Sequence, residues 1–287
     1  MKRILITGSG GFIGNFLFNS LKNKKKIKLF GTINKSKNKK LELKKILIAK
    51  KFIKKNIFKC DLSKFEEVKK VILTIKPDII FHFAAISDHS YAEKNKTKSK
   101  INNSKITKNI IKCINKDCKL IFLSSDKVYT GNPNTSPEHT NLKPYGYLAQ
   151  GKIECEKIII KNIKKFFILR LPIVHKMGEY KKYSTIDNFL YTLKNNKKIY
   201  VFKNVKRSFL KINQLISFLK KLIQSENYGI YNIGSKIYSY SDRVRNLCKI
   251  YKIKTKNKIV NLNGKIYPLI QKFNTSKVNK KFNIYFT

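Results

Sequence analysis

The fold is decided by Ile4-Leu5-Ile6-Thr7-Gly8-Ser9-Gly10-Gly11-Phe12-Ile13-Gly14, near the start of the chain. An apolar run that leads into closely spaced glycines predicts a strand, a tight turn and the start of a helix. The first glycine permits the turn, the next lets backbone amides approach a phosphate, and the last lets the helix pack against the strand. Free N–H groups and the positive dipole end at the helix start favour an anion. The stretch therefore predicts a phosphate-binding turn at Gly8, Gly11 and Gly14.

The sequence that follows alternates strand-like apolar runs with longer amphipathic segments, which indicates βαβ units and a parallel sheet. Strands are predicted at Arg3–Thr7, Ile27–Ile33, Asn56–Lys59, Asp78–Phe83, Lys119–Leu123 and Phe166–Leu171. Helices are predicted at Phe12–Leu21, Lys39–Ile48, Lys64–Ile75, Asn102–Ile114 and Tyr145–Lys161. Six strands are enough for a doubly wound parallel sheet, so the fold class is α/β.

The alternation becomes less regular after Pro172, which predicts a smaller appended lobe. Helices are expected near Thr185–Lys194, Asn213–Gln224 and Asp242–Tyr251, and strands near Ile199–Phe202 and Gly229–Ile233. We therefore expect two domains, residues 1–172 and residues 173–287, with the second interdigitated with the first.

The formal net charge of +48 raises the question of a nucleic-acid partner, because a dense cationic surface attracts phosphate. Only five of the 64 basic residues are arginine, however, and arginine is the residue that recognises phosphate and base edges in a bidentate manner. The lysines are spread over the whole chain together with many Ile and Asn, which is typical of coding drift in an AT-rich genome. We expect no nucleic-acid partner.

The cysteines and histidines indicate neither a disulfide framework nor a metal site. The five cysteines contain no CxxC pair, and the four histidines show no metal-ligand spacing. No apolar run approaches the roughly 18 residues that a membrane-spanning helix needs. We therefore expect free thiols, no metal, and a soluble cytoplasmic protein.

The spacing Thr7-Gly8-x-x-Gly11-x-x-Gly14 resembles that of the extended short-chain dehydrogenase/reductase superfamily, which contains nucleotide-sugar epimerases, dehydratases and reductases. The resemblance continues to Gly229–Gly234 and so covers nearly the whole chain. It implies that residues 1–172 form an NAD(P)-binding Rossmann domain and that residues 173–287 bind a nucleotide-sugar substrate. A homodimer is usual in the superfamily.

The resemblance also implies which residues contact the cofactor. They are Gly8, Gly11, Phe12, Ile13, Gly14, Asp61, Leu62, Ala84, Ala85, Lys152 and Pro172. The carboxylate of Asp61 would meet the adenine, although the same residue could also cap a helix that starts at Ser63. After the second strand, where an acidic residue would bind the ribose 2′-hydroxyl of NAD, the chain has Asn34 and Lys35. This substitution favours NADP(H), with NAD(H) as the alternative.

The segment Leu123–Gly131 resembles the part of the superfamily that holds a catalytic Ser or Thr, most closely in dTDP-4-dehydrorhamnose reductases. The resemblance gives Ser125 the role of binding the substrate oxygen, and Asn103 the role of supporting the active site. Lys152, followed four residues later by Glu156, matches the lysine that lowers the pKa of a catalytic tyrosine and holds the nicotinamide ribose.

The catalytic tyrosine itself does not match. The superfamily places it four residues before the lysine, where this chain has Leu148, and the neighbouring tyrosines are Tyr145 and Tyr147. Residues five apart on a helix diverge by roughly 140°, so Tyr147 would point away from Lys152. Either Tyr147 reaches the site from an irregular first turn, or another residue replaces the tyrosine, or proton transfer has been lost. We predict Tyr147 as the catalytic acid.

On the substrate side, Lys206–Asn213 resembles the segment in which an arginine contacts the nucleotide phosphates, which is Arg207 here. An exposed charge before a helix is the alternative interpretation of Arg207. The sequence thus predicts an NAD(P)-dependent enzyme that modifies a nucleotide-linked sugar, most like a 4-keto-sugar reductase. The alternatives are an epimerase or dehydratase, and a catalytically impaired regulatory subunit that still binds the nucleotide.

Overall fold

The computed structural model describes residues 1–34, 56–87, 89–129, 138, 142–176, 184–265, 269–272 and 274–287. The predicted helix Lys39–Ile48 and the predicted cofactor residue Lys35 lie outside the described residues. The chain forms two compact units, each assembled from separate stretches. Unit 1 comprises Met1–Val128, Pro144–Leu169 and Phe218–Ile230, and unit 2 comprises Tyr129–Lys143, Arg170–Ser217 and Tyr231–Thr287. The division into domains at residue 172 stays a prediction.

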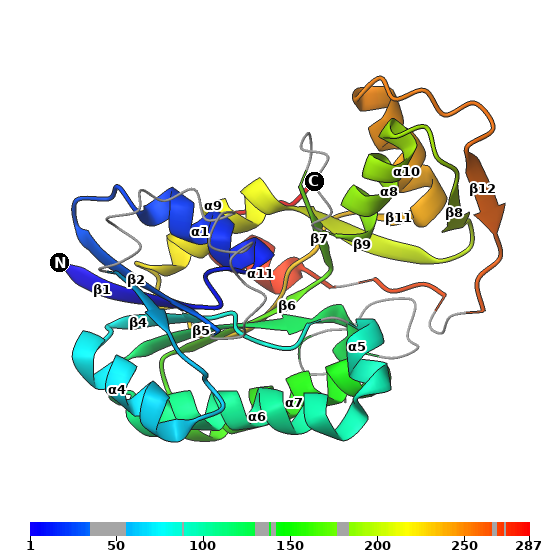
Figure 1. Ribbon diagram of the computed structural model, residues 1–287. Coiled ribbons are helices and arrows are strands. Elements are labelled where there is room, and N and C mark those ends of the chain that lie inside the picture. Colours follow the sequence, from blue (N-terminus) through cyan, green and yellow to red (C-terminus); the bar gives the residue numbers. More distant parts are fainter. Residues whose placement is uncertain are drawn as a thin grey trace. The chain divides into compact units, whose positions relative to one another are not determined.

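The main sheet has seven strands (Figure 1). Its strands are β1 (Lys2–Thr7), β2 (Ile27–Ile33), β3 (Ile57–Lys59), β4 (Ile79–His82), β5 (Lys119–Ser125), β6 (Phe166–Leu171) and β10 (Gly229–Asn232). They are arranged in the order β10-β6-β5-β4-β1-β2-β3, and the pairs β1–β2, β1–β4, β2–β3 and β4–β5 are parallel. The doubly wound α/β fold predicted from the sequence is confirmed.

Strand β10 differs from its expected place. The sequence assigned this strand to the appended lobe, whereas it lies at the edge of the main sheet beside β6. The six other strands were predicted with ends that agree to within one or two residues. A strand is recognised from its local pattern, but its partner is chosen by hydrogen bonds with a distant segment, and the sequence pattern does not contain that information.

The chain order reverses beside β1. From β1 the chain continues to β2 and β3 on one side of the sheet, whereas β4, β5 and β6 follow on the other side. Thr7, the last residue of β1, is paired with Thr32 of β2 and with His82 at the end of β4. Ligands of open α/β sheets bind at the carboxyl ends of the strands where the order reverses, so the ends of β1 and β4 mark the candidate site.

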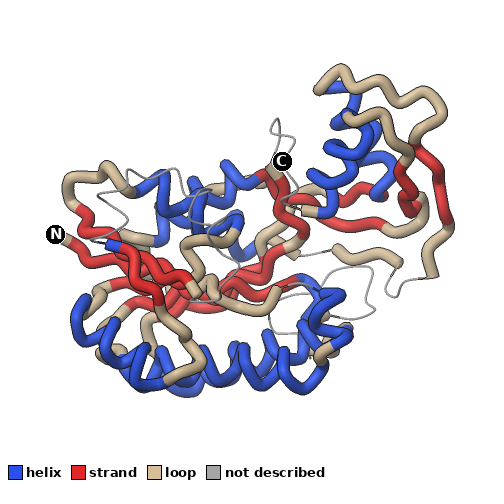
Figure 2. Tube along the Cα trace, in the orientation of Figure 1, coloured by secondary structure: helices blue, strands red, loops and turns tan. Residues whose placement is uncertain are grey.

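Helices cover both faces of this sheet. They are α1 (Phe12–Leu21), α4 (Phe65–Ile75), α6 (Lys96–Cys113) and α7 (Gly146–Asn162), with the short α5 (His89–Lys94) before α6. Helices α4, α6 and α7 lie side by side on one face, and α1 lies on the other (Figures 1 and 2). The apolar sides of α4, α6 and α7 share one core with the sheet, which includes Val68, Ile110 and Ile159. Helix α6 begins six residues before its predicted start, because lysines and hydroxyl residues obscure the apolar pattern of its first turns.

Unit 2 contains smaller sheets. Its elements are β7 (Ile173–His175), α8 (Thr185–Lys194), β8 (Ile199–Phe202), β9 (Lys206–Lys211), β11 (Ile237–Ser239), α10 (Tyr240–Ile250), β12 (Ile259–Leu262) and α11 (Ser276–Phe282). Helix α9 (Ile212–Leu222) belongs to both units. The sheets have the orders β11-β9-β7 and β12-β8, around a core that includes Leu190, Phe209 and Leu247. The sequence pattern did not predict β9, in which polar and charged residues alternate with few apolar ones, or the short elements β7, β11, β12, α5 and α11.

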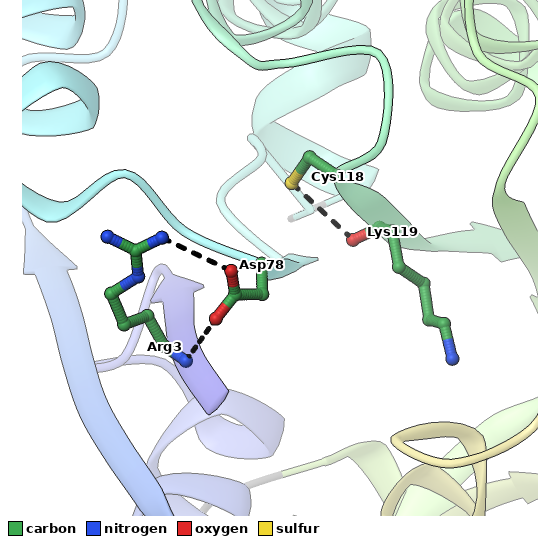
Figure 3. Close-up of polar contacts among 4 residues, drawn as sticks. All are labelled: Arg3, Asp78, Cys118 and Lys119. Atoms are coloured by element: carbon green, nitrogen blue, oxygen red, sulfur yellow. Dashed lines mark hydrogen bonds and ion pairs between the residues drawn. The ribbon is translucent and has the colours of Figure 1, made fainter. Parts of the chain in front are cut away.

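Charged side chains at the amino ends of the strands are paired with structural partners. Arg3 donates from its backbone N–H to Asp78 at 2.7 Å and forms an ion pair with the same carboxylate at 3.3 Å (Figure 3). Partial burial raises the pKa of Asp78, but the hydrogen bonds and charge of Arg3 outweigh it and lower the pKa. Lys119 is buried, and its Nζ donates to the carbonyls of Leu222, the last residue of α9, and of Ile223 and Ser225 just beyond it. These polar contacts lie at the amino ends of the strands, opposite the carboxyl ends that mark the candidate site.

Candidate cofactor and active site

The glycine turn after β1 is a tightly packed cradle. A Cβ atom on Gly14 would lie 2.3 Å from the carbonyl oxygen of Gly8, and one on Gly8 would lie 2.9 Å from the backbone nitrogen of Ala84. Gly8 has a φ of 68°, which only glycine adopts without strain. Helix α1 is preceded by Gly11, which offers no side-chain cap, and its first turn carries no acidic residue. The amides at the start of α1, including those of Phe12 and Ile13, therefore suit a phosphate.

The end of β2 supports the glycine turn from the other side. Ser9 donates from its backbone N–H and from its hydroxyl to the carbonyl of Thr32, both at 3.1 Å. A Cβ atom on Gly31 would lie 2.6 Å from the Ser9 hydroxyl, so the turn packs directly on this strand. Asn34 follows the strand and is exposed. The described residues at this point offer an amide, not a carboxylate.

The turn after β3 is fixed by its own hydrogen bonds. Asp61 accepts from the backbone N–H and the hydroxyl of Ser63, at 3.0 and 2.7 Å. Partial burial raises the pKa of Asp61, but these hydrogen bonds and the nearby lysines lower it further than burial raises it. The alternative role of Asp61 as a helix cap is wrong, because α4 is preceded by Lys64. The carbonyl of Leu62 accepts from the Asn109 side chain of α6 at 3.0 Å.

The loop after β4 is held at two points. The Thr7 hydroxyl accepts from the backbone N–H groups of Phe83 and Ala84, each at 3.1 Å. Further along, the Asn103 side chain of α6 accepts from the backbone N–H of Ile86 at 2.8 Å and donates to its carbonyl at 3.1 Å. Ala84 and Ala85, the small residues predicted to lie against the cofactor, are thus held between these two anchors.

Ser125 and Lys152 both lie at the carboxyl end of β5. The Ser125 hydroxyl donates to Asp126 at 3.1 Å and accepts from the backbone N–H of Lys127 at 3.2 Å. Lys152 of α7 is buried, and its Nζ donates to the carbonyl of Leu123 at 2.7 Å, two residues before Ser125. Burial lowers the pKa of Lys152 below its ordinary value. The structure therefore brings together a hydroxyl and a desolvated amine that the sequence predicted as catalytic.

Tyr147 points to a different neighbour. It is the second residue of α7, its backbone N–H donates to Glu93 of α5 at 3.0 Å, and Lys96 of α6 lies 5.1 Å from the centre of its ring. Leu148, one helical turn before Lys152, is buried. The first turn of α7 is irregular, with a φ of 80° at Gly146, but the Tyr147 ring contacts α6. The catalytic role of Tyr147 stays a prediction.

Two predicted residues belong to unit 2. Pro172 is buried between β6 and β7. Arg207 lies on β9, and its guanidinium donates to the carbonyls of Lys206 and Leu269, at 2.8 and 3.1 Å. These bonds give Arg207 a structural task within its unit. The contact of Arg207 with substrate phosphates stays a prediction.

Arg170, two residues before Pro172, makes several buried contacts in the interior of unit 2. It is 2% exposed and donates to the Tyr129 hydroxyl and to the carbonyl of Glu138. The Tyr129 hydroxyl donates in turn to Asn232 at 2.9 Å. Replacing this arginine would remove one hydrogen bond from each of two groups in the core, the Tyr129 hydroxyl and the Glu138 carbonyl.

His82, one of the four histidines, is the last residue of β4, and no role was predicted for it from the sequence. It is 1% exposed and lies between the hydroxyls of Thr7 and Thr107, at 3.0 and 3.1 Å. Burial lowers its pKa to about 3, and the charge of Lys152 acts in the same direction, so the imidazole is neutral. A polar residue at the end of the apolar strand Ile79–His82 is the signal that could have drawn attention to it.

The residues present fit a dinucleotide. A glycine cradle that side chains would fill and an uncapped helix start are features that suit phosphates, and Asp61, whose predicted role is to meet the adenine, has a lowered pKa. No group of three or more His, Cys, Asp or Glu among the described residues could hold a metal ion. In the part of the chain that the structure describes, no helix is long and apolar enough to cross a membrane.

The fold and the site define a dinucleotide-binding protein of the extended Rossmann class. The chain belongs to the NAD dependent epimerase/dehydratase family, whose model matches residues 4–234. A curated relative, the dTDP-D-glucose 4,6-dehydratase of Dictyostelium discoideum, is 28% identical over 265 residues, which cover 82% of this chain and 58% of the relative. The chain thus spans less than two thirds of the length of that enzyme.

Solved structures show the same fold at low identity. The dTDP-4-dehydrorhamnose reductase of Bacillus anthracis in complex with NADP has a TM-score of 0.82 and 20% identity, covering 100% of this chain and 95% of that chain. The UDP-glucose 4-epimerase of Thermotoga maritima with UDP-glucose has a TM-score of 0.81 and 15% identity, covering 97% and 91%. Proteins with different reactions share this fold, so the fold alone does not select the reaction.

Proposed function

We propose that this protein binds NADP(H) and uses it to modify a nucleotide-linked sugar, with reduction of a 4-keto group as the reaction. The observation that carries the proposal is the glycine cradle, in which Gly14 and Gly8 leave no room for side chains in front of an uncapped helix. Membership in the family and the likeness to an NADP-bound reductase support it.

The cofactor, when bound, supplies or accepts a hydride at its nicotinamide ring. We assign to Ser125 a hydrogen bond to the substrate oxygen, and to Lys152 the placement of the nicotinamide ribose. The cofactor positions at Gly8, Gly11, Gly14, Asp61, Leu62, Ala84 and Ala85, with Pro172 in unit 2, are part of the same proposal. Arg207 is assigned to the phosphates of the substrate.

The proposal is tested by mixing the purified protein with NADPH and a dTDP-4-keto-6-deoxy sugar and following the absorbance of NADPH. A reductase consumes NADPH in proportion to product. An epimerase or dehydratase would instead retain its cofactor through purification and show no net consumption, which would contradict the reductase assignment. Ser125→Ala should abolish most of the turnover, because the hydroxyl that binds the substrate oxygen is removed.

The preference for NADP(H) rests on the end of β2, where Asn34 is exposed and replaces the carboxylate that binds the ribose of NAD. Titration of the protein with NADPH and NADH should show tighter binding of NADPH. Asn34→Asp should reverse this order, since a carboxylate accepts from the 2′-hydroxyl and repels a 2′-phosphate. Tighter binding of NADH by the unaltered protein would contradict the assignment.

A second candidate is a nucleotide-binding protein without turnover. It is favoured by Leu148, which is buried one turn before Lys152, and by the Tyr147 ring, which contacts Lys96. This candidate predicts normal cofactor binding and no reaction with any nucleotide sugar. Turnover by the unaltered protein separates the two candidates. Tyr147→Phe then abolishes that turnover only if Tyr147 supplies the proton.

A further inference from the structure

The hydrogens around the Thr7 hydroxyl can be assigned by counting. This oxygen accepts from two backbone N–H groups, those of Phe83 and Ala84, and a hydroxyl oxygen has two lone pairs. Its own hydrogen must then be donated to its remaining partner, Nδ1 of His82, at 3.0 Å. Nδ1 of His82 is therefore the acceptor, and the proton of the neutral imidazole is on Nε2.

The hydrogen bonds on the Nε2 side of the His82 ring can be assigned in the same way. Nε2 of His82 donates to the Thr107 hydroxyl at 3.1 Å. The Thr107 hydroxyl donates a hydrogen bond to the carbonyl of Asn103 at 3.0 Å or to the sulfur of Cys155 at 3.2 Å. Three side chains, from β1, β4 and α6, thus form one buried chain of hydrogen bonds with a single direction, which ends either on the backbone of α6 or on Cys155 of α7.

This chain of hydrogen bonds connects the two anchors of the loop after β4. Thr7 holds the start of the loop, and the Asn103 side chain holds Ile86 further along. Helix α6, which contributes Thr107 and Asn103, also holds the turn after β3 through Asn109. Cys155 lies on α7, three residues after Lys152.

We propose that His82, as the neutral Nε2–H tautomer, is a positioning residue that couples the glycine turn to helix α6, so that the cofactor loops after β1 and β4 are held as one unit. His82 acts through Thr7 and Thr107 and does not itself touch the cofactor. The ring can do this because it is an acceptor on one side and a donor on the other. The part of the proposal that concerns cofactor affinity rests on the proposed function.

The experiment uses three variants that divide the chain of hydrogen bonds. His82→Phe removes both bonds, His82→Asn retains an acceptor near Nδ1 for Thr7, and His82→Gln retains a donor near Nε2 for Thr107. We expect His82→Phe to weaken NADPH binding about tenfold, which corresponds to the net loss of about one hydrogen bond. His82→Asn should recover most of the affinity, because Thr7 is adjacent to Gly8, and His82→Gln should recover less.

The matched control is Ile80→Ala, on the same strand two residues earlier, where Ile80 is fully buried in the core. It should lower the stability of the protein and leave NADPH affinity unchanged. If His82→Phe binds NADPH like the unaltered protein, if His82→Asn recovers nothing, or if Ile80→Ala loses as much affinity, the positioning role is overturned.

Two measurements on the protein without cofactor separate this inference from the proposed function. Nitrogen NMR of the His82 ring should show a proton on Nε2 and no titration between pH 5 and 8, and a proton on Nδ1 would overturn the tautomer. Hydrogen exchange should show the amides of Phe83, Ala84 and Ile86 losing protection together in His82→Phe; separate losses would overturn the coupling. A protein that binds no dinucleotide but passes both measurements would refute only the proposed function and the affinity effect that depends on it.

Discussion

The carboxyl ends of β1 and β4 are organised differently from the carboxyl end of β5. At β1 and β4, the side chains of Thr7 and His82 join a continuous set of buried and partly buried hydrogen bonds that fixes the neighbouring loops. At β5, Ser125 bonds to its own neighbours, Lys152 donates to the carbonyl of Leu123, and Leu148 occupies the place of the expected tyrosine. The residues at the ends of β1 and β4 therefore support cofactor binding more completely than those at the end of β5 support proton transfer.

The largest effect is expected at the glycine cradle. Gly14→Ala would place a Cβ atom 2.3 Å from the carbonyl of Gly8, an overlap that only a backbone shift can relieve. We expect NADPH affinity to fall about hundredfold or more, equivalent to about 3 kcal/mol. Gly11→Ala is the graded control, since its Cβ would lie 3.2 Å from the same oxygen and should weaken binding less. Equal affinities for both variants in a fluorescence titration would contradict the importance of this cradle.

The next largest effect is expected at the carboxyl end of β5, where the expected tyrosine is missing. Leu148→Tyr places a phenol one helical turn before Lys152, where a general acid could reach the substrate. We expect turnover with a 4-keto-sugar nucleotide to rise about hundredfold, while NADPH affinity stays the same. Leu148→Phe is the matched control, with the ring but no hydroxyl. An equal rise in both variants would show that the added volume, and not proton transfer, is responsible.

A smaller effect is expected when one loop anchor is removed. Asn103→Ala breaks both hydrogen bonds to the backbone of Ile86 and leaves a partly buried N–H and carbonyl without that partner. The free energy of unfolding in urea should fall by about 1–3 kcal/mol. Asn162→Ala removes an exposed hydrogen bond to Ile158 at the end of α7 and should change it by less than about 0.5 kcal/mol. Similar losses at the two positions would argue against a special role for the anchor.

The smallest effect is the pH dependence that His82 adds. Its pKa is about 3 in the folded protein and near 6.5 when unfolded, so the unfolded chain binds the proton between these values. Stability should therefore fall as the pH decreases below about 6.5, with a contribution of about 1 kcal/mol per pH unit. His175, with a pKa of about 4, adds a slope of the same sign.

The measurement is therefore the difference between the unaltered protein and His82→Phe, from urea unfolding at several pH values between 5 and 8. The variant should lose the slope of His82 and keep that of His175. Parallel pH profiles would mean that His82 is not held neutral by its buried surroundings. That result would contradict the organised set of hydrogen bonds at the carboxyl ends of β1 and β4.

Much of the fold could be predicted because its signals are local. The glycine turn, the helix Phe12–Leu21 and the strand Phe166–Leu171 each follow from a pattern within about ten residues, and the structure has them with the predicted bounds. The start of α6 and the strands β7, β9, β11 and β12 of unit 2 could not be predicted in this way, whereas β8 was predicted at Ile199–Phe202. Lysines on solvent-facing positions hide the apolar period there, and strands of three or four residues give too few positions to show it.

In the candidate site, too, the features encoded locally could be predicted and the long-range contacts could not. By itself, the sequence determined the order of strand, turn and helix that makes a phosphate-binding cradle, because adjacent residues encode that geometry. Only the tertiary structure decided that Asn109 holds Leu62, that His82 links Thr7 to Thr107, and that the Tyr147 ring contacts Lys96. These contacts join segments far apart in the chain, and they depend on how the sheet and its helices pack, which no local pattern of residues specifies.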